Sequence, residues 1–114
     1  FLFLFSGSVF GQEEVKKEYY DNGKLKSETH YKNGKREGLN TEWDKTGNKV
    51  SETHWKKGIK DGLYILWYPN GKKAVKLHFK NGKLEGLQTM WYESGIKMGR
   101  VHWKNGIENG VRTE

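Results

Sequence analysis

Residues 62–86 read GLYILWYPNGKKAVKLHFKNGKLEG and contain one repeat of this chain with both of its turns. The runs Gly62–Tyr68 and Lys73–Lys80 are rich in β-branched and aromatic residues and contain no proline, which favours strands. Between them, Pro69 presets φ at the second turn position and Gly71 takes the left-handed one. Asn81-Gly82 is an Asn-Gly pair, which favours a type I′ hairpin turn. The stretch therefore predicts strand, turn, strand, turn.

The same unit recurs every 24 residues from Tyr19 to Glu114 without insertion or deletion. Three glycine columns define it: Gly23, Gly47, Gly71, Gly95; Gly34, Gly58, Gly82, Gly106; and Gly38, Gly62, Gly86, Gly110. Two aromatic columns accompany them: Tyr19, Trp43, Trp67, Trp91, and Tyr31, Trp55, Phe79, Trp103. A fixed period of this length indicates a repeat array. We predict an all-β fold, an elongated antiparallel β-meander of roughly eight strands, built from four hairpin repeats at 19–42, 43–66, 67–90 and 91–114.

The third glycine column follows an acidic residue in three copies and predicts a β-bulge inside the strand. Two-residue turns at the second column place three histidines opposite these acidic residues, as His30–Glu37, His54–Asp61 and His78–Glu85, which favours structural cross-strand pairs. Because a bulge alters the register, the two aromatic columns can lie on one face of the sheet or on two.

The first eleven residues differ from the array. Phe1–Phe5 is an apolar run, and Val9 and Gly11 occupy the −3 and −1 positions of a leader cleavage site. The run is too short to span a bilayer. We predict that residues 1–11 are a signal-peptide remnant cleaved near Gly11 and that residues 12–18 are a short linker; the alternative for the apolar run is a first β-strand. We therefore predict that the protein is exported and is located in the periplasm, at the envelope or outside the cell.

Composition argues against catalysis. The chain has 33% hydrophobic, 31% charged and 14% aromatic residues and no cysteine, so large rings supply much of the burial and thiolate metal sites are excluded. Equivalent histidines of successive repeats lie roughly 9.5 Å apart, too far to share a metal ion. No serine or cysteine recurs beside them as a nucleophile. No phosphate loop or dinucleotide fingerprint appears. We predict no enzyme, no metal and no cofactor.

The pattern aromatic-x-x-x-Gly, then His-aromatic-Lys-Asn-Gly-x-x-acidic-Gly-Leu, resembles the MORN-type repeat variant of bacterial proteins in the YwqK antitoxin family. The resemblance covers Tyr19 to Glu114. It implies a twisted, elongated β-meander, and the family label implies neutralisation of a toxin-like partner. MORN repeats elsewhere are associated with protein scaffolding and with phospholipid surfaces.

Repeat three, residues 67–90, holds five basic residues and one acidic residue. With one arginine of repeat four its lysines form a candidate binding surface: Lys72, Lys73, Lys76, Lys80, Lys83 and Arg100. Such a cluster can steer an acidic partner; the alternative is a solvated face that blocks edge pairing. The column Glu28, Glu52, Lys76, Arg100 changes sign halfway along the array, and beside it Thr29 and Thr53 give way to Leu77 and Val101.

These features predict an exported, non-enzymatic scaffold that binds another protein, toxin-like if the family label applies. The alternative is a basic module that binds an anionic lipid or acidic glycan surface. The net charge of +7 and the aromatic columns also suit nucleic acid, but export makes this partner unexpected. The last strand lacks the aromatic residue of its column, so we expect either a longer native chain or a C-terminal edge that self-associates or takes up a partner strand.

Overall fold

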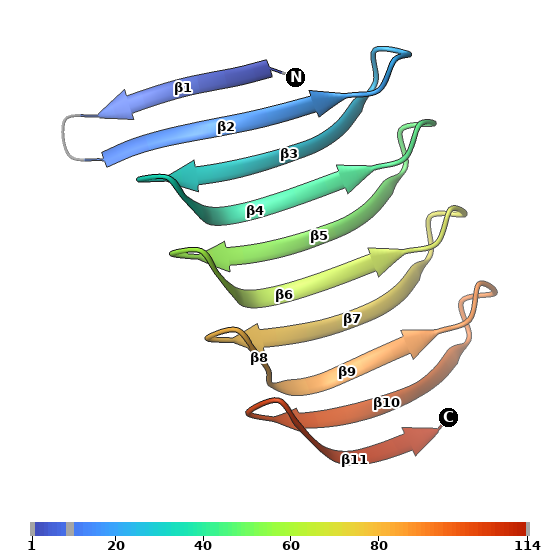
Figure 1. Ribbon diagram of the computed structural model, residues 1–114. Coiled ribbons are helices and arrows are strands. Elements are labelled where there is room, and N and C mark those ends of the chain that lie inside the picture. The colour runs from blue at the N-terminus through green and yellow to red at the C-terminus, as the bar shows by residue number, and fades with distance from the viewer. Residues whose placement is uncertain (1, 9–10, 114) are drawn as a thin grey trace.

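The computed structural model describes the backbone of residues 2–8 and 11–113 and the side chains of residues 12–108. These residues form a single sheet of eleven antiparallel strands (Figure 1). The strands are β1 (Leu2–Ser8), β2 (Gly11–Tyr19), β3 (Leu25–Lys32), β4 (Lys35–Trp43), β5 (Lys49–Lys56), β6 (Ile59–Trp67), β7 (Lys73–Lys80), β8 (Lys83–Leu84), β9 (Gly86–Trp91), β10 (Lys97–Lys104) and β11 (Ile107–Thr113). They pair in chain order, except that β8 pairs only with β7. The predicted all-β meander is confirmed. None of the described residues belongs to a helix that could cross a membrane.

The sheet has more strands than the predicted eight because the N-terminal residues add β1 and β2 and because one predicted strand is divided into β8 and β9. Residues 12–18, which we expected to form a linker, lie in β2 and pair with β3 from Glu13 opposite Lys32 to Glu18 opposite Ser27. Leu2–Ser8 pairs with β2 in turn. Tyr19 at the end of β2 belongs to the column of Trp43, Trp67 and Trp91, so β2 corresponds to the second strand of each repeat. Cleavage near Gly11 stays a prediction.

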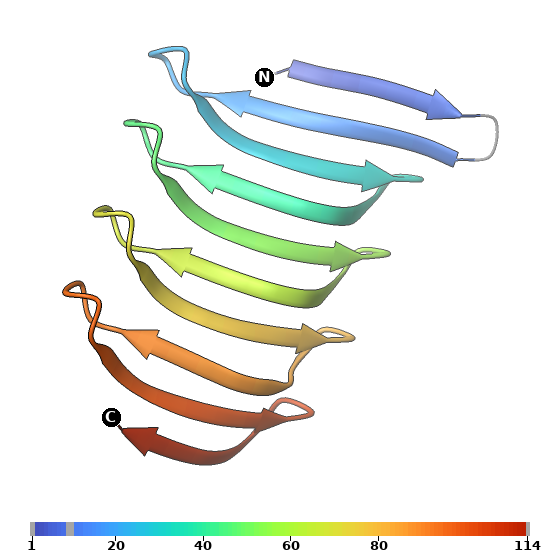
Figure 2. The same ribbon diagram turned by 180° about the vertical axis from the view of Figure 1, so that it is seen from behind.

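The short turns lie along one edge of the sheet and the long turns along the other (Figures 1 and 2). Asn33 and Gly34 of the first short turn have φ of 52° and 77°, and the same pair of positive angles recurs in the other three. Positive φ at both central residues confirms the type I′ prediction. Lys57 adopts this left-handed conformation at φ 50° although it is neither asparagine nor glycine.

Each long turn closes with two backbone hydrogen bonds. In the third, Tyr68 N donates to Lys72 O at 2.8 Å and Gly71 N donates to Tyr68 O at 2.9 Å. The turns also contact one another, since the Tyr68 hydroxyl donates to Trp91 O at 2.6 Å and Tyr20 donates to Trp43 O at 2.7 Å. Hydrogen bonds to neighbouring backbone carbonyls thus tie successive repeats together along this edge.

The second long turn breaks this pattern because Asp44 replaces the tyrosine. Its carboxylate accepts hydrogen bonds from the Thr46 hydroxyl at 2.7 Å and from the Thr46 and Asn48 amides at 3.0 Å each. The Thr46 hydroxyl, aided by the turn N–H groups, holds the pKa of the Asp44 carboxyl below its usual value. Asp44 therefore stabilises its own turn instead of contacting the next one.

The register shifts beside the third glycine column, between Thr29 and Tyr31 in the first copy, confirm the predicted bulge. Thr53 and Trp55 are two residues apart in β5 and share a face. The register shift at the end of the pair places its extra residue in β5, so β4 keeps its alternation and Trp43 shares the opposite face with Thr41. The two aromatic columns therefore lie on different faces. We define face A by Tyr31, Trp55, Phe79 and Trp103, and face B by Trp43, Trp67 and Trp91 together with the row Glu28, Glu52, Lys76 and Arg100.

No second layer covers either face within the described residues (Figures 1 and 2). Each side chain is shielded only by its neighbours on the same face, so even Ile65, the most buried aliphatic side chain described, keeps 7% of its surface exposed. Threonine and serine occupy several of the most buried positions, such as Thr41 and Ser51. The fold therefore depends on cross-strand pairs and turns more than on a closed core.

Candidate binding surfaces

The structure separates the six basic residues that we predicted as one surface. Lys76 and Arg100 lie on face B, each opposite Thr89. Lys80 and Lys83 face each other at the short-turn edge. Lys72 and Lys73 lie at the long-turn edge, where Lys72 Nζ donates to Ser94 O at 2.9 Å. An eight-residue strand is about 24 Å long. Neighbours in sequence thus reach opposite edges, and the six residues do not form one continuous surface. Binding by them stays a prediction.

The short-turn edge carries a row of exposed lysines instead. Its members flank the four short turns: Lys32, Lys35, Lys56, Lys57, Lys80, Lys83 and Lys104. Within the described residues no ion pair joins these seven lysines to a carboxylate. We call this row the lysine edge. The sequence contained its signal, a lysine on one or both sides of every short turn.

The acidic residues near this edge bind backbone rather than histidine. Glu37 Oε1 accepts from Lys57 N at 2.9 Å and Asp61 Oδ1 from Asn81 N at 3.1 Å, and Glu85 makes the same contact with the fourth short turn at 3.2 Å. His54 Nδ1 lies 2.8 Å from Leu63 O. The carboxylates therefore contact turn N–H groups instead of the expected histidine side chains, although Glu85 N donates to His78 O at 2.9 Å and so keeps the third pair opposite each other in the backbone. Each carboxylate is turned toward the short turn of the next repeat, where it satisfies a backbone N–H.

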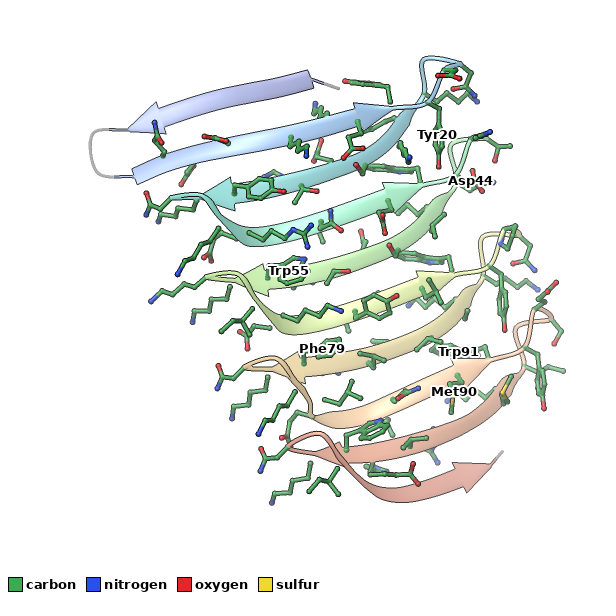
Figure 3. All side chains as sticks on the ribbon, in the orientation of Figure 1. Tyr20, Asp44, Trp55, Phe79, Met90 and Trp91 are labelled. Atoms are coloured by element: carbon green, nitrogen blue, oxygen red, sulfur yellow. The ribbon has the colours of Figure 1, made fainter. Side chains whose placement is uncertain are left out.

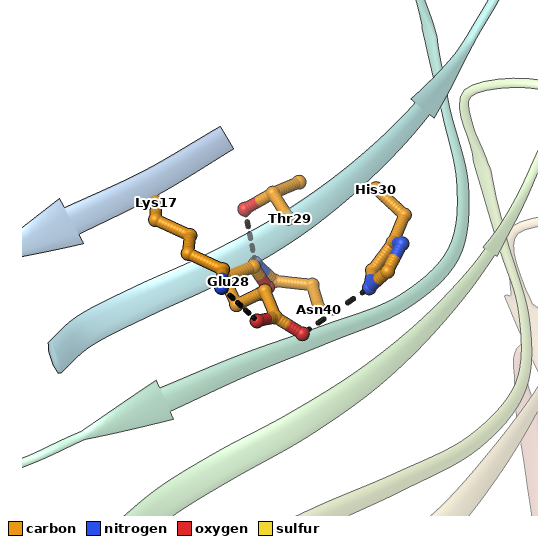
Figure 4. A network of polar contacts seen from close by, with 5 residues as sticks. All are labelled: Lys17, Glu28, Thr29, His30 and Asn40. Carbon is orange, nitrogen blue, oxygen red and sulfur yellow. Dashed lines mark hydrogen bonds and ion pairs between the residues drawn. The ribbon is translucent and has the colours of Figure 1, made fainter. Parts of the chain in front are cut away.

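Face B is charged along its central row, and its acidic half is paired within the chain. Glu28 lies 3.7 Å from Lys17 Nζ and 3.3 Å from His30 Nε2 (Figure 4). Lys49 Nζ lies 2.9 Å from Glu52. These contacts offset the negative charge of the row, so the change of sign seen in sequence does not create a strongly acidic half.

Face A carries a ladder in which aromatic and basic side chains alternate across neighbouring strands. The Arg36 guanidinium carbon lies 4.8 Å from the centre of the Trp55 ring. Lys60 Nζ lies 5.8 Å from the same centre and 5.1 Å from that of Phe79. Figure 3 shows Trp55 and Phe79 on adjacent repeats. These are cation–π distances, so the rings hold both cations in place.

Over the first two repeats, face A has a polar groove of about 350 Å³, and Arg36, Trp55 and Lys60 of the ladder are among the residues that line it. Buried hydroxyls of Thr29, Ser51 and Thr53 are among the residues that line it. Ser51 Oγ donates to Glu42 Oε1 at 2.9 Å. Burial raises the pKa of the Tyr64 phenol, and the charge of Glu42 raises it further, so this hydroxyl stays protonated in the groove.

Over the last two repeats the same face is apolar. The register Leu66–Val75–Met90 runs across β6, β7 and β9. Other apolar side chains continue it: Leu77, Phe79, Val101 and Trp103. The exchange of Thr29 and Thr53 for Leu77 and Val101 was the sequence signal for this change. These side chains are buried or half-buried by one another, and no second layer covers them within the described residues. A contiguous apolar sheet face of this kind is typical of an interaction site.

Two tryptophans of the same column differ in their hydrogen bonds, which yields a test of the ladder. Trp103 Nε1 donates to Gln88 Oε1 at 2.7 Å, whereas Trp55 Nε1 is buried without a hydrogen-bond partner. Replacing either tryptophan by phenylalanine removes a similar area of aromatic side chain. We expect Trp103→Phe to lower the free energy of unfolding by about 1 kcal/mol more than Trp55→Phe, as measured by urea unfolding. Equal losses would show that the indole hydrogen bond does not stabilise the sheet.

Comparison with protein-family models matches residues 15–33, 60–81 and 84–105 to the MORN repeat variant. The three segments together cover more than half of the chain. They leave out residues 34–59, in which Asp44 replaces the turn tyrosine and Lys57 replaces the turn asparagine. A search of curated proteins finds no match.

Proposed function

We propose that this chain, which belongs to the MORN repeat variant family, is a non-enzymatic scaffold that binds another protein through face A. Repeats of this family are non-catalytic and bind proteins or membranes. The observation that carries the proposal is the uncovered apolar half of face A. The sheet measures 49 by 35 Å, so half of one face is roughly 850 Å², close to the area that one partner buries in a standard interface.

The test places a photo-crosslinking amino acid at three successive positions of β7 in the source cell. Phe79 lies on face A, His78 on face B, and Lys80 on the lysine edge. We expect a crosslinked partner from position 79 and none from position 78, because apolar contacts with face A do not reach the other side. The yield of this crosslink should not fall when the reaction is carried out at high salt, since apolar contacts are not screened. Adducts of equal yield from positions 78 and 79 would contradict the proposal.

A second candidate function rests on the lysine edge. Seven exposed lysines lie along one edge, and within the described residues none of them forms an ion pair with a carboxylate, which favours contact with an anionic lipid or acidic glycan surface. In the same crosslinking experiment this function predicts contacts from position 80 that disappear as ionic strength rises. The two functions use different parts of the sheet and can therefore coexist.

Export and the nature of the partner complete the proposal. The apolar N-terminal run and the small residues before Gln12 support export, and fractionation of the source cell tests it. The resemblance to the YwqK antitoxin family supports a toxin-like partner. Strand addition or self-association at β11, which lies at one end of the strand order, is a further proposal that light scattering addresses.

A further inference from the structure

We propose that Arg36 and Lys60, held against Trp55, form a carboxylate-binding site on face A. The inference rests on the proposed function and specifies the partner: it presents an acidic side chain next to apolar ones. Arg36 comes from β4, Trp55 from β5 and Lys60 from β6, so the two cations approach the ring from the strands on either side of it. Trp55 and Lys60 are direct cross-strand partners.

Both cations are ordered but lack a carboxylate within the described residues. The rings hold them at 4.8 Å for Arg36 and at 5.1 and 5.8 Å for Lys60. No ion pair within the described chain includes either residue. A guanidinium that lies against an aromatic ring keeps its N–H edge available for two hydrogen bonds to a carboxylate. Because the side chains are already ordered, a ligand loses less entropy on binding.

The acidic residues of the groove lie too far along the strands to occupy this site. Glu42 is opposite Ser51, four residues from Trp55 on β5, which corresponds to about 14 Å. Its carboxylate already accepts a hydrogen bond from Ser51. Glu18 pairs across β2 and β3 with Ser27, likewise four residues from Tyr31. Within the groove, the carboxylates of Glu18 and Glu42 therefore lie toward the opposite end from Arg36 and Lys60. Glu14, the acidic residue of face A at the level of the ladder, is separated from Arg36 by β3.

The repeats show that these cations are not required by the fold. Arg36 and Lys60 occupy equivalent positions in the first two repeats. The same position is Leu84 in the third repeat and Glu108 in the fourth, and a hairpin forms in each of them. A cation needed for the hairpin itself would recur in every copy. The site is thus confined to the first two repeats, and Lys60 contacts Phe79 at the border of the apolar half. A partner that binds both regions has its carboxylate toward the N-terminal repeats and its apolar side chains toward the C-terminal ones.

The experiment follows the indole N–H resonances of the full chain by two-dimensional NMR, with Trp55→Phe and Trp103→Phe used to assign them. The probes are two matched peptides, acetyl-Phe-Leu-Glu-amide and acetyl-Phe-Leu-Gln-amide. We expect the Glu peptide to shift the Trp55 resonance and to bind about tenfold more tightly than the Gln peptide. Lys60→Gln should remove most of this preference. The control Lys56→Gln removes the same charge from the exposed lysine edge and should leave the preference unchanged.

Equal affinities for the two peptides at Trp55, or an equal loss of preference in both variants, would overturn the carboxylate site. A response of Trp103 to both peptides without a response of Trp55 would also overturn it, while supporting face A as the interface. If neither resonance moves at millimolar peptide, the carboxylate site fails, and the crosslinking yields from positions 78 and 79 alone decide the proposed function.

Discussion

Gly62→Ala is expected to lower the free energy of unfolding by about 3 kcal/mol, more than alanine at the turn glycine Gly71. Gly62 has φ +111°, which lies beyond the left-handed region that asparagine and lysine adopt in the short turns. A Cβ at this position would also lie 3.2 Å from His54 Cβ and 3.7 Å from His54 Cγ. The backbone strain and the contact with His54 therefore add, because the bulge brings both strands together here.

The matched control for this substitution is Gly71→Ala in the third long turn. Gly71 has φ +86°, and an added Cβ would meet no atom within 4 Å. Only the conformational cost remains, which we estimate at about 1 kcal/mol. Urea unfolding followed by circular dichroism measures both variants. A Gly71→Ala variant that loses as much stability as Gly62→Ala would show that contact with His54 is unimportant and that the bulge can relax.

Leu77→Asp is expected to lower the free energy of unfolding by about 3 kcal/mol. Leu77 is 9% exposed in the centre of the apolar half of face A, opposite Tyr64. A carboxylate there loses its hydration, and its cross-strand partner Tyr64 carries no positive charge that would compensate. Because each repeat contacts only its neighbours, the damage should stay local: amides of β7 and β9 should exchange faster while those of β3 and β4 stay protected.

The control is His78→Asp, one residue further along β7. His78 is exposed on face B, so the same charge stays in water, and we expect a change below about 0.5 kcal/mol. Hydrogen exchange and urea unfolding of the two variants provide the comparison. Similar destabilisation by both would mean that the faces are wrongly assigned or that β7 has no preferred side toward solvent.

The repeat period and the turns could be predicted because their causes are local. Positive φ at Asn33 and Gly34 follows from the conformational freedom of those two residues, wherever the hairpin lies. The same holds for the bulge beside Gly38 and for the left-handed Gly71. The strands could then be predicted as well, since the residues between these turns have high strand propensity.

The binding surfaces could not be predicted, because they depend on which strands become neighbours and on where the bulge shifts the register. The bulge turns Glu37 toward the N–H of Lys57 rather than toward His30. The cation–π contacts of Trp55 join residues from three strands, and Lys60 is recognisable as its cross-strand partner only once the register of β5 and β6 is known. Similarly, the six basic residues that we predicted as one surface are distributed over face B, the lysine edge and the long-turn edge, which their spacing in the sequence does not reveal.

The amino-acid sequence by itself determined the all-β repeat, its 24-residue period, and the conformation of its turns, because glycine and asparagine act within a few residues of their own position. Only the tertiary structure decided that the aromatic columns lie on opposite faces, that the N-terminal residues extend the sheet, and that Arg36 and Lys60 meet at Trp55. Those outcomes require the register between strands, which side-chain contacts across the whole sheet establish together.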